Sequence, residues 1–350
     1  MKIVFLIGNG FDIKLNMNTR YKDFYKFYIA LPQNNEPDII KQFKKDLGDN
    51  KDIELWSDLE NVLGYYLGKI EKKEDAVILH EDLIDKLSQY MGLEEKKHKI
   101  DKTKKEQLFE YISKAYFNKD FTNEEINEIG ELLRVFGTET DWEINIITFN
   151  YTKTIENMIG DFYPPLMIMN NGQNNINLSG ITHIHGFTNK EMVLGVNDDT
   201  QIANEIYKTE TDITDRYIKT NSNNTYGTGR DKKCQKLLEE ARIVVLYGLS
   251  IGDTDLKWWK KLSHTLINGK IIFFDYLKEP KPNDNQGARI KNIKEQIRNK
   301  LLTHLTQKQD FEYVSRVPEI ELQRLPLKPY KSLTSMQNDL AVYSVSSFQV

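Results

Sequence analysis

Short apolar runs recur along the chain, and three of the clearest are followed directly by glycine or asparagine. The clearest runs occupy residues 2–7, 144–149, 242–247 and 270–276. Such runs are typical of strands buried on both faces of a parallel sheet. Residues 166–169, before an Asn-Asn-Gly turn, and the alternating residues 181–185 predict two further strands. Because helical patterns alternate with these strands, we predict an α/β fold with a doubly wound, mostly parallel, Rossmann-like sheet.

A helical pattern without strands interrupts this order. The segment between residues 36 and 137 is rich in charged residues, and its apolar residues lie three and four positions apart. This pattern predicts four or five amphipathic helices. We therefore expect a discontinuous α/β domain, residues 1–35 and 140–330, and a helical insertion or cap, residues 36–139. Residues 94–106 are nearly all charged and predict a connector. Helices are also expected over 231–241, 253–267 and 287–305, a polar loop with some helix over 196–228, and a frayed tail over 331–350.

Composition narrows the class of protein. The 350 residues are 39% hydrophobic with a net charge of -4, which supports a folded core and gives no basic excess for a nucleic-acid partner. Cys234 is the single cysteine, so a disulfide framework and a cysteine-rich zinc site are excluded. No apolar run approaches the twenty residues of a membrane span. We expect a cytoplasmic protein without membrane or nucleic-acid partners.

Four polar corners follow predicted strands. They are Gly8-Asn9-Gly10-Phe11-Asp12, Thr148-Phe149-Asn150-Tyr151, His183-Ile184-His185-Gly186 and Gly248-Leu249-Ser250-Ile251-Gly252-Asp253-Thr254-Asp255. In an open parallel sheet, these carboxyl ends converge on one crevice, where ligands bind. The sequence therefore predicts a ligand site made by all four corners.

The first corner fits a phosphate turn, because glycines allow close backbone approach and free N–H groups can face an anion. The dinucleotide fingerprint is incomplete, since Ile13 takes the place of its third glycine. A tight turn that binds nothing is the alternative. If the corner holds a phosphate, Gly10→Val should abolish nucleotide binding and leave the fold largely intact.

Asn150 and the histidines have two interpretations each. Asn150 can hold a ribose hydroxyl or an attacking water, or it can cap the following helix. His183 and His185 lie two apart on a predicted strand and should face one side. His185 is a candidate general base, with His183 its neighbour or a core histidine. A metal pair is the alternative, although no third ligand is evident.

The fourth corner also contains a different catalytic pattern. Gly248-x-Ser250-x-Gly252 fits the nucleophile elbow of a serine hydrolase, in which the chain order Ser, Asp, His is possible. His264 and His304 lie downstream of the serine, and Asp275 ends a predicted strand. This alternative leaves the first three corners without a role. Asp253 and Asp255 can instead cap the next helix.

As a set, these motifs resemble the AbiH family of bacterial abortive-infection proteins. The similar segments are Gly8-Asn9-Gly10-Phe11-Asp12 with Thr19-x-Tyr21-x-x-Phe24, Trp56-x-x-Leu59-Glu60, Phe149-Asn150-Tyr151-Thr152, Ile184-His185-Gly186 and Tyr247-Gly248-x-Ser250-x-x-Asp253-x-Asp255. They cover about residues 3 to 280. AbiH is in turn similar to sirtuin-like domains, which hydrolyse NAD in defence proteins.

The resemblance implies roles for particular residues. Gly8, Asn9, Gly10 and Phe11 would contact pyrophosphate and ribose, and Asp12 and Thr148 would complete that side. Asn150 would hold a ribose hydroxyl or water, and His185 would be the base. Gly248, Ser250 and Asp255 would line the adenosine side. Asn9, Asp12 and Thr152 depart from the sirtuin pattern, and the absent zinc ribbon argues against peptide deacylation.

We therefore expect an antiphage effector that binds NAD and hydrolyses it to ADP-ribose and nicotinamide without a metal. The partners implied are a nucleotide and a phage-derived trigger protein, and a homo-oligomer is open. One alternative is a metal-dependent nuclease or hydrolase that uses Asp12, Asp253 and Asp255. The other is a non-catalytic nucleotide sensor whose helical insertion docks a partner.

Overall fold

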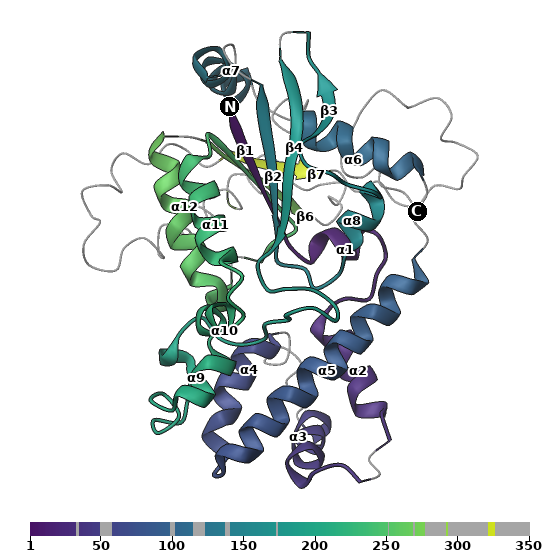
Figure 1. The fold of residues 1–350 in the computed structure, drawn as a ribbon, viewed down its shortest axis with the longest axis vertical. Helices are drawn as coiled ribbons and strands as arrows, with labels where there is room; N and C mark the ends of the chain where they lie inside the picture. Colours follow the sequence, from purple (N-terminus) through teal and green to yellow (C-terminus); the bar gives the residue numbers. More distant parts are fainter. Residues whose placement is uncertain are drawn as a thin grey trace.

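The protein is an α/β structure built on one mixed sheet (Figure 1). The computed structural model describes residues 1–32, 35–49, 58–98, 102–114, 123–136, 141–172, 174–250, 252–268, 270–276, 292 and 321–325. Its strands are β1 Lys2–Ile7, β2 Trp142–Thr148, β3 Leu166–Asn170, β4 Asn175–His183, β5 Ile243–Tyr247, β6 Lys270–Tyr276 and β7 Glu321–Leu325. They lie in the order β3-β4-β2-β1-β5-β6-β7, parallel except for β3, which pairs antiparallel with β4.

Strand β1 lies at the centre of this sheet. Its residues Ile3 to Ile7 are all buried, as the continuous apolar run predicts. Phe5 aligns with Ile146 of β2 on one side and with Val245 of β5 on the other. The buried runs therefore predicted four strands correctly, and the run at 166–169 predicted β3.

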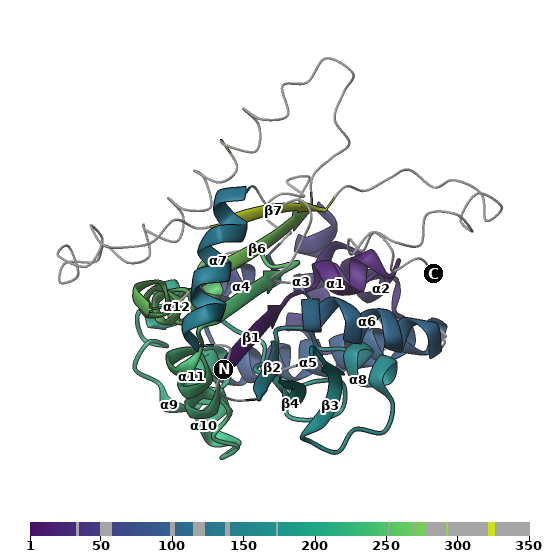
Figure 2. The ribbon, with the colours of Figure 1, turned by 90° about the horizontal axis from the view of Figure 1, so that it is seen from above.

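Helices cover both faces of the sheet (Figure 2). On one face α1 (Gly10–Lys14), α6 (Lys102–Lys114), α7 (Asn123–Phe136) and α8 (Thr154–Ile159) pack on Ile3, Phe5 and Ile7. On the other face α11 (Arg230–Glu240) and α12 (Leu256–Asn268) pack on Val4 and Leu6. Successive residues of β1 point to opposite faces, so this one strand supplies both cores.

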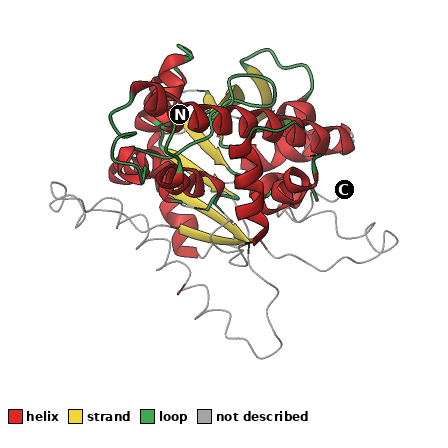
Figure 3. Cartoon of the chain, turned by 90° about the horizontal axis from the view of Figure 1, so that it is seen from below, coloured by secondary structure: helices red, strands yellow, loops and turns green. Residues whose placement is uncertain are grey.

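A helical cap lies beyond the carboxyl ends of the parallel strands (Figures 1 and 3). It contains α2 (Tyr21–Ala30), α3 (Asp38–Asp49), α4 (Leu59–Tyr66), η2 (Leu67–Lys69), α5 (Lys73–Lys97), η3 (Asp199–Gln201), α9 (Thr211–Tyr217) and α10 (Lys219–Thr225). The cap has its own core, in which Leu59, Leu63, Leu83 and Leu87 are buried at their predicted helical spacing. The predicted four or five helices between residues 36 and 137 are confirmed, as α3 to α7.

Two predicted elements differ in the structure. Helix α5 continues to Lys97 and buries Glu94, so residues 94–97 are helix and not connector. Strand β4 begins at Asn175 and ends at His183. The chain turns away beyond it, because Gly186 has a φ of +67° and the carbonyl of His185 accepts a hydrogen bond from Val193 N. His185 therefore does not alternate with His183 along a strand.

The helix predicted over 287–305 and the tail over 331–350 lie outside the described residues, apart from residue 292. None of the helices in the described part of the chain combines the length and apolar character needed to cross a membrane.

Candidate functional site

The four predicted corners meet at the carboxyl edge of the sheet. Backbone hydrogen bonds join them: Gly8 N donates to Tyr247 O (2.9 Å), Phe149 N to Ile7 O (2.9 Å) and Ile184 N to Thr148 O (3.0 Å). These contacts follow directly from the parallel registers of β1, β2, β4 and β5. The prediction that the corners converge is confirmed.

The glycines of the first and fourth corners pack backbone against backbone. Gly10 N donates to Gly248 O at 2.9 Å, and Gly248 has a φ of +63°. A Cβ on Gly10 would lie 2.5 Å from Gly248 Cα, and one on Gly248 would lie 2.7 Å from Gly10 Cα. Because the obstacle is backbone, the expectation that Gly10→Val would spare the fold is wrong.

The N–H groups of the first corner are largely used inside the protein. Gly8 N donates to Tyr247 O at the end of β5, Gly10 N donates to Gly248 O of the fourth corner, and Phe11 N donates to Gly8 O at 3.0 Å. The Asn9 side chain donates to Thr19 O at 2.9 Å and accepts from the Thr19 hydroxyl. The Phe11 ring lies edge-on to Tyr247, with ring centroids 6.0 Å apart. The corner is thus a well-fixed turn rather than a row of free donors.

Asp12 and Asn150 form a buried polar group beside this turn. Asp12 is 1% exposed, and Thr152 Oγ1 donates to its Oδ2 at 2.6 Å. Burial raises the pKa of Asp12 to about 6, and the hydroxyls of Thr152 and Thr154 oppose the rise. Among the described residues, Asp12 Oδ1 and both side-chain polar atoms of Asn150 have no hydrogen-bond partner. Such atoms cost free energy unless a ligand or water meets them.

The structure excludes one of the two predicted roles of Asn150, that of a helix cap. Helix α8 has Lys153 at its N-cap and no side-chain capping bond, so Asn150 does not cap it. The backbone of Asn150 is held instead, by donation of its N–H to Thr148 Oγ1 at 3.1 Å. Its side-chain amide is buried and makes no aligned hydrogen bond within the described residues, although it lies close enough to Asp12 to act against the rise of that carboxyl's pKa.

His183 has a structural role. Its Nδ1 lies 2.9 Å from Asn150 O and its Nε2 lies 2.7 Å from Glu156 Oε1, so both ring nitrogens are used. Within the described ranges, no three His, Cys, Asp or Glu side chains are grouped so that they could hold a metal ion. This includes the proposed set of Asp12, Asp253 and Asp255.

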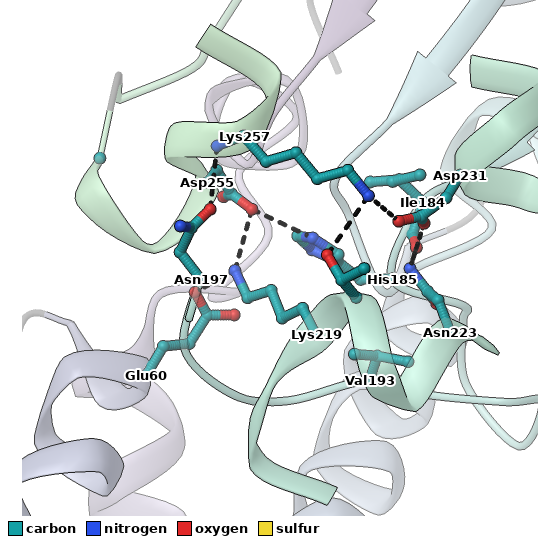
Figure 4. Close-up of polar contacts among 12 residues, drawn as sticks. Glu60, Ile184, His185, Val193, Asn197, Lys219, Asn223, Asp231, Asp255 and Lys257 are labelled. Atoms are coloured by element: carbon teal, nitrogen blue, oxygen red, sulfur yellow. Dashed lines mark hydrogen bonds and ion pairs between the residues drawn. The ribbon is translucent and has the colours of Figure 1, made fainter. Parts of the chain in front are cut away.

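His185 lies in a buried cluster of charged side chains (Figure 4). Its Nε2 approaches Asp255 Oδ1 to 3.1 Å, without the alignment of a hydrogen bond. Lys219 Nζ donates to the same Oδ1 at 2.9 Å and to Glu60 Oε2 at 2.6 Å. The hydroxyls of Tyr21 and Tyr151 each lie 3.3 Å from Glu60 Oε1. We call Glu60, His185, Lys219 and Asp255 the charge cluster.

Burial and charge act against each other in the charge cluster. Burial by itself raises the pKa of Asp255, but Lys219 and His185 outweigh it and hold that pKa well below its usual range. Burial lowers the pKa of Lys219, and its two carboxylate partners reverse this into a rise. Burial raises the pKa of Glu60, against the pull of Lys219. Asp255 is thus a carboxylate held between two nitrogen groups.

Aromatic rings fix the His185 imidazole. Phe149 lies edge-on to it with ring centroids 5.5 Å apart, and Phe149 itself stacks on Trp259 at 5.7 Å. Tyr151 lies on another side at 6.3 Å. Gly186 follows, where a Cβ would run into the backbone of Glu191. The residues around His185 therefore leave its ring little freedom.

Ser250 does not form a nucleophile elbow. It is exposed, and the chain reaches the short helix η4 (Asp253–Asp255) only three residues later. An elbow needs the serine on a tight turn from strand directly into helix. The side chains of its proposed partners His264, Asp275 and His304 lie outside the described part of the chain.

The end of cap helix α5 binds three of the loops around this edge. Glu94 Oε2 accepts from Asn18 N at 3.1 Å. Glu95 accepts from Lys153 N through one oxygen and from Thr188 Oγ1, at 3.2 Å, through the other. The charged run at 94–106 predicted a connector, so this contact was missed, as was the role of Lys219 in a polar, Asn-rich segment.

A separate open cavity of about 670 Å³ lies on the cap. Residues of α5, α9 and α10 line it, with the loop 189–192. It includes none of the predicted site residues, so we do not assign the site to it.

These features define an α/β protein with a capped polar edge on its sheet. A family model described as bacteriophage abortive infection AbiH matches residues 4–276, from β1 through β6. The chain therefore belongs to the AbiH family. A search of curated proteins finds no match.

Proposed function

We propose that this protein is an abortive-infection effector that binds NAD at the carboxyl edge of its sheet and hydrolyses it. The main support is the pairing of two features there. One is the buried Asn150 amide and Asp12 Oδ1, which make no aligned hydrogen bond within the described residues, and the other is the histidine–carboxylate pair of His185 and Asp255. Family membership supports the role in phage defence. In this proposal the protein acts in the cytoplasm and a phage-derived protein triggers it.

The strand order supports a nucleotide as the ligand. β1 and β5 are neighbours, and the chain continues from them to β2 and β6 on opposite sides of the sheet. In a doubly wound, Rossmann-like or sirtuin-like sheet, a nucleotide binds in the crevice at this point. The phosphates would lie along Gly8–Asp12 with Thr148 beside them, and adenosine along Gly248 and Ser250. The N–H groups of Gly8, Gly10 and Phe11 are used internally, so these three do not hold the phosphates.

The reaction needs no acid for its leaving group. The bond between C1′ of the ribose and the nicotinamide nitrogen breaks, and its electron pair neutralises the pyridinium ring. Water attacks C1′, where oxocarbenium character develops, and gives up one proton. The products are ADP-ribose, nicotinamide and that proton. Asn150 would hold a ribose hydroxyl or the water through its free amide.

His185 would accept the proton. With a proton on Nε2, facing Asp255, the imidazole presents Nδ1 as its basic nitrogen. A carboxylate that fixes the tautomer of a histidine is the arrangement of a catalytic triad. We therefore assign Asp255 to orientation of His185 rather than to the adenosine side.

The test is a quantitative assay of the purified full-length protein with NAD, in which chromatography measures nicotinamide and ADP-ribose. His185→Ala should reduce turnover by about 10²–10⁴, the usual cost of losing a general base. A fluorescence titration should still show NAD bound. His98→Ala, at the C-cap of α5, is the matched control.

The trigger must be supplied as well. Cells that express the protein together with phage genes should lose NAD, and cells with His185→Ala should keep it. Parent-rate turnover by His185→Ala would refute the mechanism. NAD binding without turnover in the triggered state would favour a sensor, and EDTA-sensitive cutting of nucleic acid would favour a nuclease.

A further inference from the structure

The charge cluster joins the sheet edge to the cap through a single oxygen atom. Asp255 Oδ1 lies 3.1 Å from His185 Nε2 and 2.9 Å from Lys219 Nζ (Figure 4). The second partner of Lys219 is Glu60 of α4, at 2.6 Å. The side chains of Lys219 and Glu60 are each only 7% exposed, so solvent screens these charges little. The four groups come from α4, α10, η4 and the turn after β4.

The electrostatic consequence can be followed along this chain of contacts. A negative Asp255 favours a proton on His185, and the positive Lys219 on the same oxygen weakens that effect. Glu60 in turn offsets part of the charge of Lys219. Tyr151 faces the imidazole from the segment after β2, and the hydroxyls of Tyr151 and Tyr21 lie at Glu60.

We propose that Lys219 and Glu60 are positioning residues that set the protonation of His185 through their shared hold on Asp255. The positive charge of Lys219 on the shared oxygen opposes a second positive charge on the imidazole, and Glu60 offsets part of the charge of Lys219. The benefit to catalysis rests on the proposed NAD hydrolysis. The effect on protonation does not.

Two substitutions of similar size should act in opposite directions. In Lys219→Met the lysine charge is removed from the shared oxygen, so Asp255 stabilises a protonated imidazole more strongly. In Glu60→Gln, Lys219 interacts with Asp255 alone, so the imidazole binds its proton less tightly. Each change should move the midpoint of the His185 titration by about one pH unit, to higher pH in the first variant and to lower pH in the second.

The measurement is an NMR titration of histidine-labelled full-length protein without NAD, with the His185 signal assigned by its loss in His185→Ala. Lys44→Met is the matched control, because Lys44 is an equally buried lysine paired with Glu36 of the cap. It should not move the midpoint. If Lys219→Met fails to fold, two other variants still carry the test. One is Glu60→Gln, and the other is the double variant Lys219→Met/Glu60→Gln, which removes both charges of the Lys219–Glu60 ion pair. The double variant should titrate above Glu60→Gln.

The pH–rate profile connects the proposal to catalysis. Lys219→Met should move the acid limb of NAD hydrolysis to higher pH, with turnover recovering as pH rises. Titrations that stay unchanged, or that move in the same direction in Lys219→Met and Glu60→Gln, overturn the proposal. Opposite shifts without any NAD hydrolysis would uphold the proposal and refute the reaction.

Discussion

The buried carboxyl of Asp12 should make the protein less stable as pH rises from 4 to 7. Its pKa is raised from 3.8 to about 6 in the folded protein, mainly by burial. Below pH 3.8 the carboxyl is protonated in both the folded and the unfolded chain. Between 3.8 and 6 the unfolded chain ionises first, which lowers its free energy relative to the folded state and so lowers the free energy of unfolding.

The size of this effect follows from the shift. About two pKa units, at about 1.4 kcal/mol for each unit, correspond to about 3 kcal/mol of stability. About half of this is lost by pH 5, and nearly all of it by pH 7.5. Asp12→Asn cannot ionise and keeps an oxygen to accept the Thr152 hydroxyl. Relative to the parent, its free energy of unfolding should therefore rise by about 1–1.5 kcal/mol between pH 5 and pH 7.5.

Denaturant unfolding at a series of pH values measures this difference directly. The quantity compared is the change with pH in the difference between the free energies of unfolding of the parent and Asp12→Asn. The difference at any single pH also includes the hydrogen bonds that the new amide makes. Asp161→Asn, at an exposed position, is the control and should follow the parent at every pH. A parent–Asp12→Asn difference that stays constant from pH 5 to 7.5 would refute the assignment of a raised pKa to Asp12.

Two further predictions concern packing. Gly10→Ala should destabilise the fold by about 1–3 kcal/mol, because its Cβ meets the backbone of Gly248. The control Gly92→Ala adds a Cβ that meets no atom within 4 Å, so it should be neutral or stabilising. Thermal melts that rank the two variants in the reverse order would contradict this. Cys234 is fully buried and its pKa is raised to about 12 by burial, so a thiol reagent should label it only on unfolding. Fast labelling of the native protein would show that the thiol is accessible.

Patterns that depend on burial could be read from the sequence. The runs at 2–7 and 242–247 correspond to β1 and β5, because a strand covered on both faces has no polar side. The meeting of the four corners followed from the same reasoning. For Gly10, however, the sequence pattern indicates the close approach of a ligand as the reason for the glycine. In the structure, the contact that requires glycine at this position is with the backbone of Gly248.

Long-range charge pairs could not be predicted in this way. Lys219 lies 159 positions from its partner Glu60, in a polar segment without periodicity. Nothing local distinguishes it from an exposed lysine, since its burial depends on where α10 meets α4. Glu95 is a similar case, because a charged helix end normally faces solvent. Cys234 is fully buried, because it lies on the face of α11 that packs on Val4 and Leu6.

The central position of β1 also constrains how the chain folds during its synthesis. Lys2 pairs with Glu143 and Ile3 with Ile243, so the first strand has no partner nearby in the sequence. At about 5–20 residues per second, a ribosome needs on the order of ten seconds to reach β2. Through that interval an apolar strand with two open edges is exposed, while only helices of local contacts can form. Aggregation of nascent chains, rather than loss of the mature fold, is therefore the hazard that this topology creates.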